Sequence, residues 1–210
     1  MTSHCQRREA PTMTTSQHVH TSTTPESLLT PPMRALENAG ALDPAVTAAN
    51  ALSSVITGNE SIRDLLRGKR LGHALHPLII EVPMGTWMSA LVLDTLGGSD
   101  GRRAARLLTG VGVLSAVPSA LTGWAEYSGL QQRDKRVTVV HAGANGAAAA
   151  LQAGSWFARR AGRHGLGRVL ALGGMSAAGL GGYLGGHLSV SRQVGSRDAA
   201  YDDGTNGREH

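Results

Sequence analysis

The stretch that decides the fold is VLALGGMSAAGLGGYLGGHLSVS, residues 169–191, which contains no Asp, Glu, Lys or Arg. These 23 residues are enough for a helix to cross the hydrocarbon core of a bilayer, which takes about 20. A helix of a soluble bundle shows a polar stripe at helical spacing, whereas this stretch offers only three serines, Tyr183 and His187. We therefore predict a membrane-spanning helix here.

Three further stretches of the chain have a similar composition. Residues 71–93 carry one charge, Glu81, and residues 107–125 and 137–158 carry none. The segments between them are short and rich in arginine, as is typical of loops held at a membrane surface. The pattern predicts an all-α protein with a four-helix transmembrane bundle over residues 71–192. A soluble bundle with buried Ala- and Gly-rich helices is the alternative, and it leaves the missing polar stripe unexplained.

The remainder of the chain is more polar. Residues 1–43 are rich in Ser, Thr, Pro and His without apolar periodicity, which predicts a disordered tail. They also lack the apolar core of a secretory signal. Residues 44–70 contain two short amphipathic patterns, the second with a basic polar side, which predicts juxtamembrane helices or soluble helices packed on a neighbour. Residues 193–210 predict a polar C-terminal tail.

Charge and cysteine content exclude several classes of protein. The formal net charge is +5, but the basic residues are scattered and not interleaved with aromatics, which argues against a nucleic-acid partner. A single cysteine allows no internal disulfide and no Cys-rich metal centre. The chain has no GxxxxGKS, GxSxG or HExxH motif. Whether it is an enzyme therefore stays open, as does its oligomeric state.

The distribution of Lys and Arg predicts an orientation. With four crossings, ten of these residues lie on the side of the termini and seven on the other side. Because cytoplasmic loops carry the excess of positive residues, we predict a multi-pass protein of the plasma membrane with both termini in the cytoplasm. The lipid bilayer is then its first partner.

Four crossings also bring histidines together in the leaflet nearest the termini. His73 and His76 open the first helix, His141 lies one turn into the third, and His187 lies one turn before the end of the fourth. Ionisable groups inside a membrane are costly, and they tend to face one another, a cofactor or a water path. Trp124, Glu126 and Tyr127, where the second helix ends, belong to the same layer. Asn145 follows His141 by one turn on the same face, and Glu81 follows His76 by five residues and lies deeper.

This histidine layer has three interpretations. Imidazoles ligate haem iron, so His73, His76, His141 and His187 are candidate ligands of a b-type haem in an electron-transfer protein. His76, Glu81, His141 and His187 form the corresponding candidate set for a divalent metal, with Asn145, Trp124 and Glu126 in support. The second interpretation is a non-catalytic scaffold or accessory subunit whose histidines hold helices together. The third is a proton or small-solute pathway through Glu81 and the same histidines.

Three segments carry a resemblance to a known family: RGKRLGHALHPLIIEVPMGTWMSALVLDTLGG (67–98), HAGANGAAAALQAGSWFARR (141–160) and GGYLGGHLSV (181–190). They resemble the bacterial membrane-protein family known as domain of unknown function 2231, over about residues 60–192. The HxxHP element with a following acid and PxG, and the GGHL element of the last helix, are its most specific parts. The resemblance picks out His73, His76, Pro77, Glu81, Pro83, His141, Asn145, Gly186 and His187.

The resemblance also implies a redox setting. Relatives in actinobacteria are sometimes fused to a Rieske iron–sulfur domain, and the family is similar in helix number and histidine placement to two-haem b-type cytochromes. This chain lacks Rieske cysteines, so a Rieske-type partner would be a separate polypeptide. One departure is visible at the end of the second helix, where relatives have an Asp-Trp pair and this chain has Trp124, Ala125 and Glu126.

Overall fold

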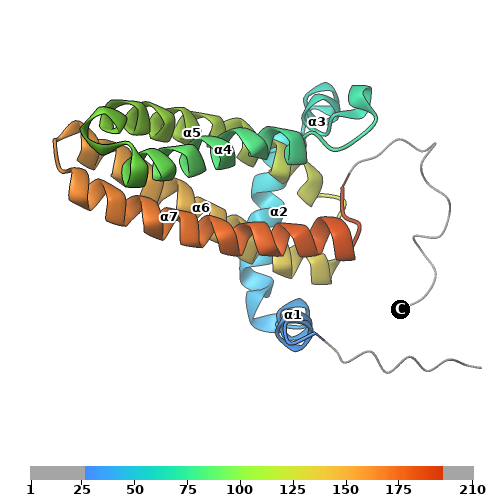
Figure 1. Cartoon of the computed structure of the whole chain (residues 1–210). Helices are drawn as coiled ribbons and strands as arrows, with labels where there is room; N and C mark the ends of the chain where they lie inside the picture. Colours follow the sequence, from blue (N-terminus) through green and yellow to red (C-terminus); the bar gives the residue numbers. More distant parts are fainter. Residues whose placement is uncertain (1–26, 196–210) are drawn as a thin grey trace, which may run out of the picture.

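The computed structural model describes residues 27–195, and every element in that range is helical. Four long helices run side by side: α4 (His76–Leu96), α5 (Gly98–Tyr127), α6 (Gln132–Arg160) and α7 (His164–Gly186), as Figure 1 shows. A short π-helical turn, His187–Ser191, continues α7. The predicted all-α architecture is confirmed.

Three of the helices in the described range are long and apolar enough to cross a membrane. They are α4, α5, and α7 with its π-helical turn. Helix α6 has 29 residues, which is long enough. It carries Asn145, Gln152 and Arg159, and so falls short of the other three in apolar character. The sequence predicted four membrane-spanning helices. Helix α6 is less apolar than the other three because several of its polar side chains face the interior of the bundle.

The first long helix begins later than the sequence predicted. Residues 69–71 form a short 3-10 turn, and Gly72 follows with a φ of 75°, a left-handed conformation that favours glycine. Pro77 then occupies the first turn of α4, where its missing N–H leaves no intrahelical hydrogen bond unmade. Helix α4 therefore starts at His76, and its apolar surface begins just beyond that residue.

The four helices form two antiparallel hairpins, α4 with α5 and α6 with α7, packed against each other in one bundle. Small residues line the contacts within the hairpins, among them Ala105 and Gly112 of α5 and Ala171 and Gly174 of α7, all buried. Gly101 lies close to the backbone of α4, since a Cβ there would lie 2.8 Å from the carbonyl oxygen of Leu93. Backbones can come this close in lipid only where side chains are small.

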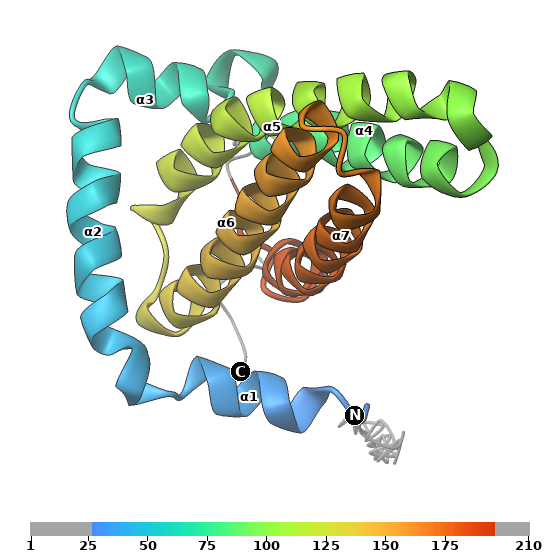
Figure 2. The same ribbon diagram turned by 90° about the vertical axis from the view of Figure 1, so that its left-hand side faces the viewer.

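Three shorter helices wrap around one side of the bundle: α1 (Thr30–Glu37), α2 (Asp43–Thr57) and α3 (Glu60–Leu66), as Figure 2 shows. We refer to them together as the collar. Ser53 Oγ donates a hydrogen bond to the carbonyl of Trp124 at 3.0 Å, and Tyr127 Oη donates to the carbonyl of Val46 at 3.2 Å. These hydrogen bonds hold α2 against the C-terminal end of α5.

Helix α1 occupies part of the segment predicted to be a disordered tail. Pro31 and Pro32 lie in its first turn, where proline is tolerated, and Met33 is buried in an apolar cluster with Val137 and Leu184. Leu36 packs against the same cluster, so α1 has an apolar face, but at eight residues the helix is too short for that pattern to stand out in a segment rich in Pro and Thr. The prediction of disorder for residues 30–43 is therefore wrong. The rest of the two predicted tails, residues 1–26 and 196–210, lies outside the described residues.

Candidate functional site

His76 of α4 and His141 of α6 meet inside the bundle. Their ring centroids are 6.4 Å apart, and the ring planes are nearly perpendicular, at 82°. Both side chains are only partly exposed. Since α4 and α6 belong to different hairpins, the two rings mark the place where the hairpins face each other. We refer to these two residues as the histidine pair.

Each ring of the histidine pair is held by the other helix of its own hairpin. The Nδ1 of His76 lies 2.8 Å from the carbonyl oxygen of Ser119 in α5, and the Nδ1 of His141 lies 2.8 Å from the carbonyl oxygen of Gly181 in α7. A carbonyl oxygen only accepts, so Nδ1 carries the hydrogen in both rings. The lone pair of each imidazole is then on Nε2.

Glycines and Asn145 complete the surroundings of the histidine pair. A Cβ on Gly123 would lie 3.1 Å from Cε1 of His76, and a Cβ on Gly185 would lie 2.9 Å from Cε1 of His141. Each ring thus packs directly on a helix backbone. Asn145 Nδ2 donates to Nε2 of His141 at 3.1 Å. Among residues 27–195, no hydrogen bond reaches Nε2 of His76.

The other candidate residues lie away from the histidine pair. His187 Nε2 contacts Glu37 Oε1 of the collar at 2.8 Å. His73 is exposed before α4, with Nδ1 at 3.1 Å from the carbonyl of Ala74. Glu81 is exposed on α4. Within the described part of the chain, no three His, Cys, Asp or Glu side chains converge as a metal site would require.

The supporting aromatic and acidic residues lie at the end of α5. Trp124 packs edge-on against Tyr127, with ring centroids 5.3 Å apart, and its carbonyl receives the hydrogen bond from Ser53. Glu126 is partly buried two residues further along. The Trp124 carbonyl therefore connects α5 to the collar, and Asn145 forms a hydrogen bond with the histidine pair.

A buried ion pair lies at the opposite end of the bundle. Arg159 of α6 makes two hydrogen bonds to the Asp94 carboxylate of α4, at 2.6 and 2.5 Å. Their side chains are 1% and 2% exposed. Arg168 of α7 adds a hydrogen bond to the Asp94 carbonyl and lies 3.9 Å from its carboxylate. Bidentate hydrogen bonding of this kind is the strongest geometry for an Arg–carboxylate pair.

The two hairpins repeat the same contacts at the same spacing. Asp94 and Arg159 are 65 residues apart, and the same interval separates His76 from His141 and Trp87 from Gln152. Trp87 Nε1 donates to the carbonyl of Thr109, and Gln152 Nε2 donates to the carbonyl of Ala171, both at 3.3 Å.

Glycine lies opposite each of these side chains. A Cβ on Gly112 would collide with Trp87, and a Cβ on Gly174 would lie 3.0 Å from Gln152. The bond from α4 to α5 spans 43 residues at His76, and the bond from α6 to α7 spans 40 at His141. The corresponding spans at Trp87 and Gln152 are 22 and 19. The second hairpin is thus shorter by a constant three residues, and the two hairpins are copies of one structural unit.

Sequence reasoning missed both the ion pair and the repeat. Asp94 and Arg159 fall at the edges of apolar stretches, where charges are expected at a membrane surface. The signal that could have found them is spacing, because Asp94 follows His76 by the same number of residues as Arg159 follows His141. A repeat is easily overlooked when only isolated positions correspond and the residues around them differ.

Three membrane-length apolar helices, packed together with α6 in two hairpins around buried polar contacts, define the class: a helical integral membrane protein. Residues 72–198 match the family described as predicted membrane protein (DUF2231), and the chain belongs to that family. The chain has no match among curated proteins or solved structures.

Proposed function

We propose that this membrane protein is an electron-transfer component that binds a b-type haem, or a metal ion in its place, through His76 and His141. The observation that carries the proposal is the histidine pair itself. Each Nδ1 is engaged by a helix carbonyl, so both rings present Nε2, the nitrogen suited to ligate iron. Hydrogen bonds of this type fix the tautomer of ligating histidines and raise their basicity.

The size of the gap is compatible with one shared ion. A metal–imidazole nitrogen bond is about 2 Å long, so two imidazoles that held one ion between them would lie within a few ångströms of each other. The observed separation is 6.4 Å. His76 and His141 would be enough to hold haem iron, whereas a structural zinc takes four ligands. The geometry therefore favours haem over a divalent ion that would recruit Glu81 and His187.

Several residues around the histidine pair would hold its two rings in position for a ligand. The carbonyls of Ser119 and Gly181 orient the rings, and Gly123 and Gly185 let them lie against the helix backbones. The Asn145 amide holds Nε2 of His141, and it has to release that nitrogen before His141 can act as a ligand. When bound, haem iron carries one electron between its ferric and ferrous states.

The proposal includes three further elements that rest on the sequence. They are a location in the plasma membrane, termini on the cytoplasmic side, and a separate redox partner of the Rieske type. A protease added to intact cells tests the orientation, because it cannot reach cytoplasmic termini and should leave both of them uncut. Co-purification of a Rieske-type protein with the tagged chain tests the partner.

A structural scaffold is the second candidate, and a specific observation favours it. His76 and His141 each join two helices by a hydrogen bond, and their rings fill notches at Gly123 and Gly185. Such bonds between membrane helices are stabilising without any cofactor, by about 0.6 kcal/mol on average. In a scaffold, the two histidines would only join helices through these hydrogen bonds and packing contacts.

A visible spectrum separates these candidates. The full chain is expressed with haem and trace metals available, extracted in mild detergent, and measured before and after dithionite, with elemental analysis of the same sample. We expect a Soret band that shifts and sharpens on reduction. His76→Ala and His141→Ala should each abolish it, while His73→Ala, at an exposed position, should retain it. Asn145→Ala should retain or strengthen it.

The scaffold predicts a different result. The purified protein would be folded, colourless and free of metal, and His76→Ala and His141→Ala would only lower its melting temperature. That outcome would exclude the redox proposal.

A further inference from the structure

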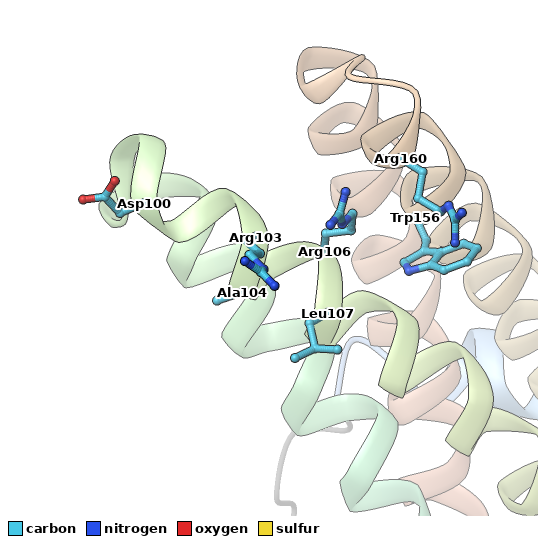
Figure 3. A pocket seen from close by; sticks show the side chains of 7 residues that line it. All are labelled: Asp100, Arg103, Ala104, Arg106, Leu107, Trp156 and Arg160. Atoms are coloured by element: carbon cyan, nitrogen blue, oxygen red, sulfur yellow. The ribbon is translucent and has the colours of Figure 1, made fainter.

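The molecule has a cleft far from the histidine pair, between the start of α5 and the end of α6. Its volume is about 790 Å³. Figure 3 shows the side chains around it: Asp100, Arg103, Ala104, Arg106, Leu107, Trp156 and Arg160. Three guanidinium groups therefore surround one opening. We refer to Arg103, Arg106 and Arg160 as the arginine cluster.

The arginine cluster is not neutralised by the protein. Within residues 27–195, no carboxylate forms an ion pair with Arg103, Arg106 or Arg160. The nearest acid in sequence, Asp100, points away from the cluster in Figure 3. Arg160 instead lies over the Trp156 ring, 4.9 Å from its centroid. Cation–π contact positions a guanidinium without cancelling its charge.

At the opposite end of the bundle, several basic residues do form ion pairs. Arg136 pairs with Asp43 at 2.8 Å, Arg192 pairs with Asp134 at 2.8 Å, and Lys69 pairs with Asp64 at 2.7 Å. At the cleft end, the buried Asp94 carboxylate is already engaged by Arg159. The positive charge of the cleft thus remains available to a ligand.

Helix lengths put the cleft at the membrane surface. Helix α5 has 30 residues, about 45 Å at 1.5 Å each, against a hydrocarbon core about 30 Å thick. Its uncharged part is residues 107–125, so residues 98–106 extend into the headgroup region. Arg160 ends α6 at the same level. Trp156 is an aromatic residue of the kind enriched at this depth.

Apolar side chains continue from the cleft along the outside of the bundle. Leu107 lines the cleft and is 66% exposed, and Phe157, in ring contact with Trp156, is 63% exposed. A ligand with a phosphate in the cleft could therefore lay hydrocarbon chains on this surface. A soluble anion would leave that surface unused.

We propose that this cleft binds the phosphodiester headgroup of an anionic phospholipid, with Arg103, Arg106 and Arg160 as the phosphate ligands. Guanidinium groups recognise phosphate oxygens by paired, charge-assisted hydrogen bonds. Trp156 keeps Arg160 in place, and the acyl chains lie over Leu107 and Phe157.

The test measures lipid retention by the full-length protein. Protein in neutral detergent is mixed with micelles doped with phosphatidylglycerol or phosphatidylcholine, and bound lipid is counted by native mass spectrometry. We expect phosphatidylglycerol to be retained preferentially. Arg106→Gln with Arg160→Gln should weaken that binding about tenfold or more, since two charge-assisted contacts are lost. The corresponding lysine double variant should bind with intermediate strength, because lysine keeps the charge but not the paired hydrogen bonds.

A matched double variant provides the control. Arg102 and Arg163 lie at the same end of the bundle and are exposed, but they do not line the cleft. Arg102→Gln with Arg163→Gln removes the same charge and should leave retention within about twofold. Equal loss in both double variants would mean diffuse attraction and would overturn the site. So would equal retention of the two lipids, or full competition by inorganic phosphate at the concentration of the lipid. Circular dichroism of each variant checks that the bundle is intact.

Discussion

The two hairpins share a set of contact positions but fill them with different residues. His76 in the first is matched by His141 in the second, so this position is identical. At the other end, Asp94 in the first is matched by Arg159 in the second, and these two are complementary. The comparison indicates that the same hairpin structure accommodates different residues at equivalent positions. Asp94 and Arg159, however, constrain each other because their charges must be opposite.

A physical reason explains why complementary residues require a single chain. In a symmetric dimer of identical hairpins, equivalent positions near the axis carry the same residue. Two aspartates or two arginines would then face each other without water, which is strongly unfavourable. With both hairpins in one chain, the positions can differ, and Asp94 can meet Arg159. The histidine pair needs no such difference, because two neutral imidazoles can face each other.

The largest expected effect is at the ion pair. Arg159→Met leaves the Asp94 carboxylate buried, with only Arg168 near it at 3.9 Å. Removing one partner of a buried pair costs about 3–5 kcal/mol. We expect a loss of that order in the free energy of unfolding, measured by denaturation in mixed micelles. Asp94→Leu combined with Arg159→Met should recover most of it, because no buried charge remains. A double variant as unstable as Arg159→Met would contradict this account.

Exchanging the two charges gives a sharper test of the repeat. Asp94→Arg with Arg159→Asp moves each residue to the equivalent position of the other hairpin. Gly167 makes room for Arg159, since a Cβ there would lie 2.7 Å from Arg159 Cγ, and the equivalent residue of α5 is Ala105. We therefore expect the exchange to fold well only with Ala105→Gly added. Equal melting temperatures with and without Ala105→Gly would argue against equivalent geometry.

The glycine notches should show the next largest effect. Gly185→Ala and Gly123→Ala each place a methyl group against a ring of the histidine pair, at 2.9 and 3.1 Å. Overpacking of this kind costs about 1–3 kcal/mol. Gly182 has open space around it, so Gly182→Ala is the matched control and should be neutral or slightly stabilising. Equal melting temperatures for all three variants would show that the rings are not tightly held.

Removing each histidine should have a smaller and similar effect in the two hairpins. His76→Ala and His141→Ala each lose one hydrogen bond between helices, which is worth about 0.6 kcal/mol on average in membrane proteins, and His141→Ala also loses the hydrogen bond from Asn145 within α6. A double-mutant cycle on the apo protein measures any energy between the rings themselves. We expect coupling of at most about 0.5 kcal/mol, since neither ring bonds to the other. A difference between the two single variants that the loss in Asn145→Ala does not account for would show that the hairpins are not energetically alike.

The smallest effect concerns the collar and acid pH. Hydrogen bonds from Arg136 and then Gln132 hold the pKa of Asp43 below its usual 3.8. Because the pKa is lower in the folded state, this contact stabilises the collar above about pH 4 and is lost as the pH falls through the folded value. Hydrogen exchange of α2 should accelerate there. In Asp43→Asn the exchange should already be faster at neutral pH and should lack this acid transition.

Much of the bundle could be predicted from composition. Uncharged stretches of membrane length set the helices and their antiparallel order, and the depth of His76 and His141 follows from that order. Helix α1 could not be predicted, because its contact rests on Met33 and on partners far along the chain. The sequence predicted that four histidines converge, whereas only His76 and His141 meet, since depth does not fix the direction in which a side chain leaves its helix.

The sequence by itself determined the class of protein, because length and hydropathy alone decide whether a helix can cross a bilayer. The repeat was also present in it, as equal intervals between histidines and between charges. Only the tertiary structure decided that His76 meets His141, that His187 turns to Glu37, and that three arginines surround one cleft. Those outcomes depend on how each helix is rotated against its neighbours, and the packing of small residues at the helix contacts sets that rotation.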